Sequence, residues 1–505
     1  MTDNSKFDSW VQRYVDGQTT SEEVRQLTEQ LRCSEQSRQR FIELMNLDSA
    51  LHATLVDADR HPDHNAAVPE LRHVSRSIEI DSTWRSRFGR RTFALLAVLG
   101  VLLVLVAGWW PMSSGENFAT VRSAEGVAEL PNAGPLPAGW HEVKAGMVEL
   151  VTTRHAEIVI EAPARFRFES AQQLRLDYGR LVAKVPPAAQ GFTVLTPTGD
   201  AIDLGTNFGV DVARGGDAEI HVFQGAVIAQ GNGGTRHRNL KDGEALQLSM
   251  HTDRELALRT TAFIQSEEVA LLHAALAAGQ HNQSQAAFTQ LKQDPALIAL
   301  LDFESGDLPA GTYRMVQGRW PGSRAPEFVN QGDHMQLDVG GDRDWPQLTM
   351  AAWVRLDQLG APYQSLLHTD GWNSTPGQVH WMVTSHTTMR LALYGNTLSP
   401  ESIEREHFPD SRTSVLPEQG RWAHLAAVYD SDRKTVRFYL NGKFDSETRQ
   451  EIAHPARLGS AQIGNWDLHD RKLSGRIDEL ILLGRAMSDA EIEALFIAGN
   501  PYGKL

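Results

Sequence analysis

Three tryptophans near the C-terminal end of the sequence have the side-chain type and the setting to bind a ligand. Trp372 and Trp381 lie in HTDGWNSTPGQVHW, and Trp466 lies in GNWDLHDRK; both stretches read as long polar loops, where binding sites usually lie. Their indole rings, together with the rings of Tyr363 and Tyr394, could stack on sugar rings. Any one of these rings is more simply explained as a buried core residue, so the prediction of a binding surface applies to the region as a whole.

Three carboxylates in the same region could hold a calcium ion. Asp302 and Glu304 stand two residues apart in LDFESG, on one face of a predicted strand, and Asp478 lies in a later strand, GRIDEL. Carboxylate oxygens are hard ligands that suit Ca²⁺. Solvated surface acids explain the three residues almost as well, and a structural calcium ion is the one cofactor that we consider.

The segment that must position these side chains, residues 296–505, reads as an all-β domain. Its runs LTMAAWVRL, GRWAHLAAVYD and TVRFYLNGKFDS are short and rich in β-branched and aromatic residues. The dipeptide Asn441-Gly442 predicts a type I′ hairpin between two of the strands. The residues that we expect in the core of a sandwich are Trp353, Trp422, Val428 and Tyr439.

This order of strands resembles the laminin-G-like, concanavalin-A-like jelly roll over about 200 residues. Related jelly rolls often hold a structural Ca²⁺ near both ends of the domain, and some hydrolyse β-glucans with the strand pattern Glu-x-Asp-x-x-Glu. The nearest stretch here, Arg476-Ile477-Asp478-Glu479, lacks the glutamate two residues before the aspartate. Because a retaining glycosidase needs two carboxylates about 5–5.5 Å apart, we predict that the chain is not an enzyme. Glycan or protein binding, or a role as a spacer or in self-association, remains for this domain.

Residues 117–262 form a second region with the two-residue periodicity of strands. FATVRSAEGVAEL, AEIVIEAPARFRFE and QLRLDYGRLVAKV are short, regularly spaced and separated by turn residues, which indicates an antiparallel sandwich or barrel. Residues 263–295, with EEVALLHAALAAG and QSQAAFTQLKQ, predict a helical connector.

One stretch of this region, GRLVAKVPPAAQGFTVLTPTGDAIDLGTNFGVDV followed by EIHVFQGAVIAQ, resembles the FecR-type domain of iron-transport regulators. The matching step is Gly205-Thr206-Asn207-Phe208, with a later strand that ends at Gly225. We interpret these residues as structural, with glycines that allow a bulge or a close backbone approach and Phe208 as a core anchor.

Residues 92–110, TFALLAVLGVLLVLVAGWW, predict a transmembrane helix. These 19 residues carry no charge, and at about 1.5 Å per residue they cross a hydrocarbon core of roughly 30 Å. A signal peptide would lie nearer the N-terminus, and a core helix would have a polar face. The excess of arginine before the span, at Arg85, Arg87, Arg90 and Arg91, predicts that the N-terminal side is cytoplasmic and the C-terminal side periplasmic.

Residues 1–56 have helical periodicity, and residues 57–91 read as a linker with a basic juxtamembrane segment. WVQRYVDGQTTSEEVRQLTEQL and SEQSRQRFIELMNLDSAL resemble the cytoplasmic anti-sigma domain of bacterial transmembrane regulators. The resemblance implies binding of an extracytoplasmic-function sigma factor through an apolar face. Many such domains hold zinc through a His-x₃-Cys-x₂-Cys motif, but Cys33 is the only cysteine here, so we expect no zinc. The candidate contacts are Val24, Leu27, Leu31 and Leu44.

The net charge of −15 lies almost entirely after the predicted span, because residues 1–91 hold 13 Lys and Arg against 15 Asp and Glu. This charge argues against a nucleic-acid partner. We therefore predict a mainly β, single-pass protein of a bacterial inner membrane that binds a sigma factor inside and a glycan or protein ligand outside. The alternative is a membrane-anchored carbohydrate-binding or adhesion protein without a sigma-factor partner.

Overall fold

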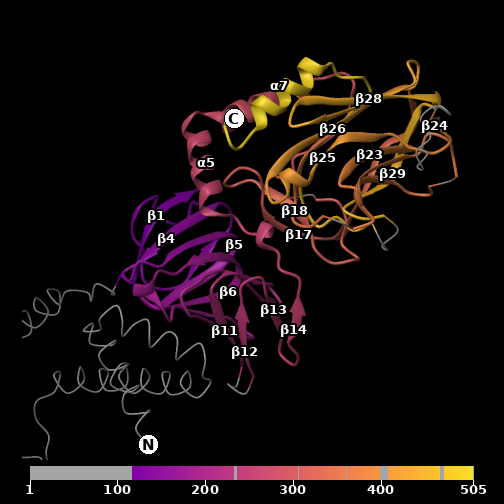
Figure 1. The fold of residues 1–505 in the computed structure, drawn as a ribbon. Coiled ribbons are helices and arrows are strands. Elements are labelled where there is room, and N and C mark those ends of the chain that lie inside the picture. Colours follow the sequence, from indigo (N-terminus) through magenta and orange to yellow (C-terminus); the bar gives the residue numbers. More distant parts are fainter. Residues whose placement is uncertain are drawn as a thin grey trace, which may run out of the picture. The chain divides into compact units, whose positions relative to one another are not determined.

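The computed structural model describes residues 117–232, 236–304, 306, 308–359, 361–372, 374–398, 408–466 and 471–503 (Figure 1). The predicted helical domain, the linker and the span at 92–110 lie outside these residues, as do Val24, Leu27, Leu31, Leu44 and Cys33. No helix in the described part of the chain combines the length and the apolar character that crossing a membrane requires.

Residues 117–262, here called the first β domain, form one connected sheet of fourteen strands. All its strand pairs are antiparallel except β6 with β7, so the predicted antiparallel character largely holds. The strands are β1 (Ala119–Glu125), β2 (Gly134–Pro135), β3 (His141–Val143), β4 (Met147–Thr152), β5 (Glu157–Ser170), β6 (Gln173–Lys184), β7 (Thr193–Leu195), β8 (Gly199–Asp203), β9 (Asn207–Val212), β10 (Ala218–Gln224), β11 (Ala226–Gly231), β12 (His237–Lys241), β13 (Ala245–Leu248) and β14 (Arg254–Leu256).

The stretch Gly205–Phe208 is structural, as its sequence suggests. The Asp203 carboxylate is buried and accepts hydrogen bonds from the Gly205 amide and the Thr206 hydroxyl, which fixes the turn into β9. Phe208 lies fully buried in the core of the domain. A Cβ added at Gly225 would lie 2.6 Å from the Thr206 methyl group, so this position requires a glycine.

Two helices, α5 (Ser266–Ala277) and α6 (Gln280–Leu291), follow the first β domain and confirm the predicted helical connector. The chain turns between them at Gly279, which has a left-handed backbone with φ of 73°.

Residues 296–503, here called the second β domain, form a nine-stranded and a seven-stranded sheet around one apolar core. The larger sheet runs β17-β18-β30-β20-β26-β27-β28-β24 with β15 beside β30, and the smaller runs β16-β19-β29-β21-β22-β23-β25. The strands are β15 (Leu297–Leu301), β16 (Gly311–Thr312), β17 (Arg314–Gln317), β18 (Arg324–Phe328), β19 (His334–Trp345), β20 (Gln347–Leu356), β21 (Tyr363–Thr369), β22 (Val379–Thr384), β23 (Thr388–Leu393), β24 (Thr397–Leu398), β25 (Asp410–Ser414), β26 (Trp422–Asp430), β27 (Thr435–Leu440), β28 (Lys443–Ile452), β29 (Ala456–Ile463) and β30 (Gly475–Leu483).

The predicted hairpin at Asn441-Gly442 is confirmed. The two residues join β27 to β28 with φ of 50° and 74°, and positive φ at both positions is what a type I′ turn needs. The end of the chain differs from the all-β expectation, because SDAEIEALF contains the helix α7 (Asp489–Gly499). Ser488 and Glu491 form a capping box at its start.

The residues predicted for the sandwich core are buried, but on the other face of the nine-stranded sheet. Trp353 and Trp422 pack with Tyr502, whereas Val428 and Tyr439 pack with residues of α6 and α7. Neighbouring side chains of the same strands, among them Ala352 and Leu425, fill the space between the two sheets. Helices cover the outside of this sheet, so both of its faces are apolar and alternation does not identify the inner one.

Candidate functional site

The outer face of the seven-stranded sheet carries Trp372 and Trp466, two of the three tryptophans that the sequence singles out. On β22, Val379, Trp381 and Val383 point into the core, and His380 and Met382 therefore point to the opposite face. Trp381 is fully buried, so its prediction as a ligand contact is wrong. Trp381 lies on a strand rather than in a loop, and the alternation of side chains along that strand points it into the core.

The outer face holds two histidines under two tryptophans. His368 on β21 and His380 on β22 are direct cross-strand partners, and their ring centroids are 4.0 Å apart. Trp372 stacks on His380 with centroids 3.8 Å apart and an interplanar angle of 27°. Trp466 meets the same imidazole edge to face at 4.9 Å. Both tryptophans remain partly exposed, whereas the two histidines are buried.

Within the described part of the chain, the two imidazoles hold unpartnered ring nitrogens beneath this face. His368 Nδ1 lies 2.5 Å from Ser365 Oγ, and the Nε2 atoms of His368 and His380 have no hydrogen-bond partner among the described residues. Burial, and then the nearby Arg471 charge, lowers the pKa of His380 to about 2. Burial likewise holds the pKa of His368 well below its ordinary value. Both rings are therefore neutral at physiological pH.

Further rings extend this surface on either side. Tyr394 meets Trp372 edge to face at 5.8 Å. The Arg471 guanidinium lies 4.7 Å from the ring centroids of both Trp466 and Tyr363, so it connects these two rings. Trp372, Trp466 and the two predicted tyrosines thus belong to one cluster. Partly exposed indoles can stack on a sugar ring, whereas the histidine Nε2 atoms beneath them are buried.

Asp478 and Glu479, the carboxylates considered for glycoside hydrolysis, both interact with Arg319. Asp478 is buried and accepts a hydrogen bond from the Arg319 amide at 3.0 Å. Glu479 forms an ion pair with the Arg319 guanidinium at 2.5 Å. Neither carboxylate lines the cavity of about 470 Å³ that is described below.

The predicted calcium ligands are not assembled into a site. Among the described residues, no three acidic, histidine or cysteine side chains are grouped so that they could hold a metal ion. Strand β15 ends at Leu301, so Asp302 and Glu304 do not share a strand face as expected. Asp302 instead pairs with Lys292 at 3.4 Å, and Glu304 accepts a hydrogen bond from the Arg324 amide at 2.7 Å.

A buried network of ion pairs joins the two β domains. Arg180 on β6 binds Asp211 on β9 at 2.7 Å and Glu327 on β18 at 2.9 Å. Arg314 on β17 binds the same two carboxylates, each at 2.6 Å. Arg476 on β30 reaches Glu327 at 3.3 Å. Burial alone would raise the pKa of Glu327, but the three guanidinium groups outweigh it and hold that pKa well below its ordinary value.

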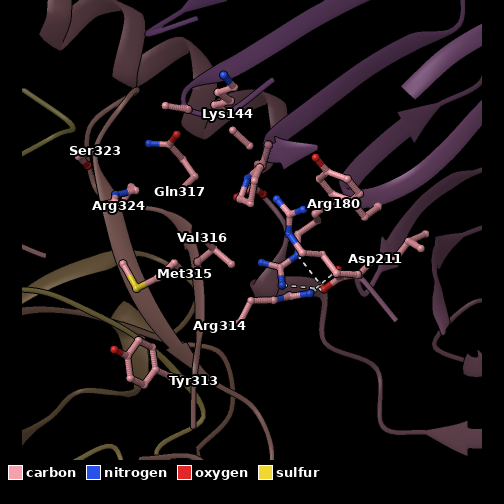
Figure 2. A pocket seen from close by; sticks show the side chains of 18 residues that line it. Lys144, Arg180, Asp211, Tyr313, Arg314, Met315, Val316, Gln317, Ser323 and Arg324 are labelled. Atoms are coloured by element: carbon pink, nitrogen blue, oxygen red, sulfur yellow. Dashed lines mark hydrogen bonds and ion pairs between the residues drawn. The ribbon is translucent and has the colours of Figure 1, made fainter. Parts of the chain in front are cut away.

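A cavity of about 470 Å³ opens beside this network. Figure 2 shows Arg180 and Arg314 converging on Asp211 at its wall, with Lys144 and Tyr313 farther away from them. Both β domains contribute lining residues. Neither the network nor the cavity is predictable from the sequence, because their residues are isolated charges on strands far apart in the chain. His368 and His380 lie on β21 and β22, whereas in the sequence the stretch that contains both reads as a polar loop.

Two family models match separate parts of the chain. Residues 144–228 match the model described as FecR protein, and residues 330–493 match the concanavalin A-like lectin/glucanases superfamily. The two resemblances expected from the sequence are confirmed for the two β domains. Each model spans less than half of the chain. No curated protein matches it.

Solved structures resemble parts of the chain at low identity. A "putative carbohydrate binding protein" from Bacteroides ovatus is 16% identical over 34% of this chain and 46% of its own, with a TM-score of 0.26. Domain 4 of the arabinanase AbnA from Geobacillus stearothermophilus, in complex with arabinotriose, is 19% identical over 40% of this chain and 98% of its own, with a TM-score of 0.30. A "putative anti-sigma factor" from Parabacteroides distasonis is 16% identical over 25% of this chain and 65% of its own, with a TM-score of 0.23. The chain thus spans about half the length of the first of these proteins.

Proposed function

We propose that this chain, which joins a FecR domain to a concanavalin-A-like domain, is a single-pass signalling regulator of a bacterial inner membrane. In this proposal residues 1–56 bind an extracytoplasmic-function sigma factor in the cytoplasm. The two β domains lie in the periplasm, where the second one binds a saccharide. The chain performs no catalysis. The combination of the two matched families supports this division of labour.

The observation that carries the ligand-binding half is the histidine–tryptophan cluster on the outer face of the seven-stranded sheet. Trp372 and Trp466 are partly exposed, and each contacts the same imidazole. The cost of leaving the Nε2 atoms of His368 and His380 without partners is about 1–3 kcal/mol each. Both nitrogens are buried beneath Trp372 and Trp466, so stacking of the partly exposed indoles on a sugar ring carries the proposal.

Saccharide binding by the purified full chain tests this half of the proposal. We expect a panel of envelope and plant polysaccharides to contain a ligand whose affinity falls about tenfold, or about 1.4 kcal/mol, in Trp372→Ala and in Trp466→Ala. Trp140→Ala is the matched control, because Trp140 is 39% exposed on the first β domain, away from the cluster. Binding that survives both substitutions, or that the control weakens equally, would contradict the proposed site.

A further inference from the structure

The cavity between the two β domains has a strongly basic lining. Five basic side chains and two carboxylates line it. The first β domain contributes Lys144, Arg180 and Arg214, and the second contributes Arg314 and Arg324. The volume of about 470 Å³ lies in the range of small-molecule sites, about 300–1,000 Å³.

The two lining carboxylates are already neutralised. Asp211 accepts hydrogen bonds from both Arg180 and Arg314 through four nitrogen atoms, at 2.6–3.1 Å. Glu161 accepts one from Arg476 at 3.1 Å and one from the Ile264 amide at 3.1 Å. A ligand that enters the cavity therefore meets little negative charge.

Some of the positive charges that line the cavity, in contrast, are not paired with a carboxylate of the described residues. Lys144 and Arg214 are exposed, and neither forms an ion pair with another described residue. Arg214 instead lies 4.0 Å from the centroid of the Tyr178 ring. About a third of the Arg314 side chain is exposed, at 36%, although it binds two carboxylates. These groups surround a volume with apolar side chains, such as Met315 and Val316, at its wall (Figure 2).

We propose that this cavity binds a small organic molecule that carries an oxyanion, a carboxylate or a phosphate. Guanidinium groups present paired N–H donors that match the two oxygens of either anion, and Lys144 adds a point charge. The apolar wall would contact the carbon skeleton of the ligand. Because residues of both β domains line the cavity, bound ligand stabilises the contact between them. This site is separate from the saccharide face and does not rest on the proposed function.

Calorimetric titration of the purified full chain tests the proposal. The probes are galacturonate as the carboxylate, glucose 6-phosphate as the phosphate ester, inorganic phosphate as the bare anion, and glucose as the neutral control. We expect galacturonate or glucose 6-phosphate to bind with a dissociation constant of about 1 mM or tighter, and glucose not to bind. Whichever of these two anions binds more tightly shows whether the site prefers a carboxylate or a phosphate ester. Binding of inorganic phosphate as tightly as of both organic anions would reject an organic ligand.

The variant Lys144→Ala/Arg214→Ala locates the binding. We expect it to weaken binding at least about tenfold, because it removes the exposed charges without touching the buried ion pairs. Arg238→Ala is the matched control, since Arg238 is an exposed arginine of the first β domain outside the cavity. Absence of binding by both organic anions, full binding by the double variant, or equal weakening by the control would overturn the proposal. Variants Trp372→Ala and Trp466→Ala are expected to bind the anion normally, which separates this site from the saccharide face.

Discussion

The two histidines beneath Trp372 and Trp466 are buried side chains, each with one ring nitrogen that has no partner in the described part of the chain. A buried imidazole normally has partners for both nitrogens, because an unpaired polar group in a protein interior is costly. His368 has a partner for Nδ1 in Ser365, yet its Nε2 has none among the described residues. Trp372 stacks on His380, and burial, followed by the Arg471 charge, lowers the pKa of His380 so that the imidazole is uncharged. The two imidazoles therefore keep the same charge state across the physiological pH range.

The same burial predicts acid sensitivity that depends on His380. In the unfolded chain histidine titrates near about 6.5, whereas the pKa of His380 in the folded protein is about 2. Between these values only the unfolded chain binds the proton, so stability is lost as pH falls below about 6.5. One such histidine costs about 2 kcal/mol at about pH 5 relative to about pH 8. We expect His380→Gln to lose about that much less stability than the unchanged protein over this range, measured by urea denaturation.

The exposed His237 supplies the control for this experiment. His237→Gln, at an exposed side chain of strand β12, controls for the general effect of replacing a histidine by glutamine. Equal losses in His380→Gln and in the unchanged protein would show that His380 does not remain neutral in the fold.

At this scale the sequence predicts the kinds of residue but not their partners. Trp372 and Trp466 lie in loops, as their polar neighbours indicate, and both reach one cluster. Trp381 reads like Trp372 in the sequence, but it faces the core because it is one residue from His380 on the same strand. Only the register between β21 and β22 shows that His368 meets His380, and register is a property of the folded sheet.

Among the elements, the strands that carry the ion-pair network decide how the two β domains contact each other. β6 and β9 supply Arg180 and Asp211, and β17, β18 and β30 supply Arg314, Glu327 and Arg476. Arg180 and Arg476 also both donate to the Ala262 carbonyl, at 2.9 Å and 3.0 Å. The segment that leaves the first β domain is therefore held by arginines from both domains.

Removing one carboxylate from this network should be severely destabilising. Asp211→Ala leaves Arg180 short of a partner in a buried position, and breaking a buried pair costs about 3–5 kcal/mol. We expect a loss of that size in the free energy of unfolding, measured by chemical denaturation. The exposed pair Arg122–Glu157 is the control, with side chains 55% and 41% exposed. Glu157→Ala should cost about 0–1 kcal/mol, and a loss this small in Asp211→Ala would contradict a structural role for the network.

The elements themselves are predictable wherever a local signal exists. The hairpin at Asn441-Gly442 and the connector helices follow from turn and helix signals in the sequence. The stretch SDAE contains the capping box of α7. It directly follows a run of predicted strands, so from the sequence we assign it to the all-β region instead of to a helix. The inner face of β20 is not predictable, because nearly every residue of QLTMAAWVRL is buried on one face or the other.

For the whole molecule, our proposal assigns ligand detection to the second β domain and the response to the N-terminal residues. The FecR segment, residues 144–228, precedes the concanavalin-A-like segment, residues 330–493, and the ion-pair network connects the domains that contain them. A ligand can shift this assembly only through different affinities for two of its states. The predicted sigma-factor contacts remain a prediction, because they lie outside the described residues.

Co-expression of the full chain with each extracytoplasmic-function sigma factor of the host, followed by co-purification, tests the regulator most directly. We predict that one sigma factor co-purifies in a stable complex. We also predict that replacing Leu27 and Leu31 by aspartate abolishes the complex, whereas Cys33→Ser, between the predicted apolar contacts, preserves it. If no sigma factor binds to a full chain that still binds its saccharide, the regulator is contradicted and the chain is a membrane-anchored carbohydrate-binding protein.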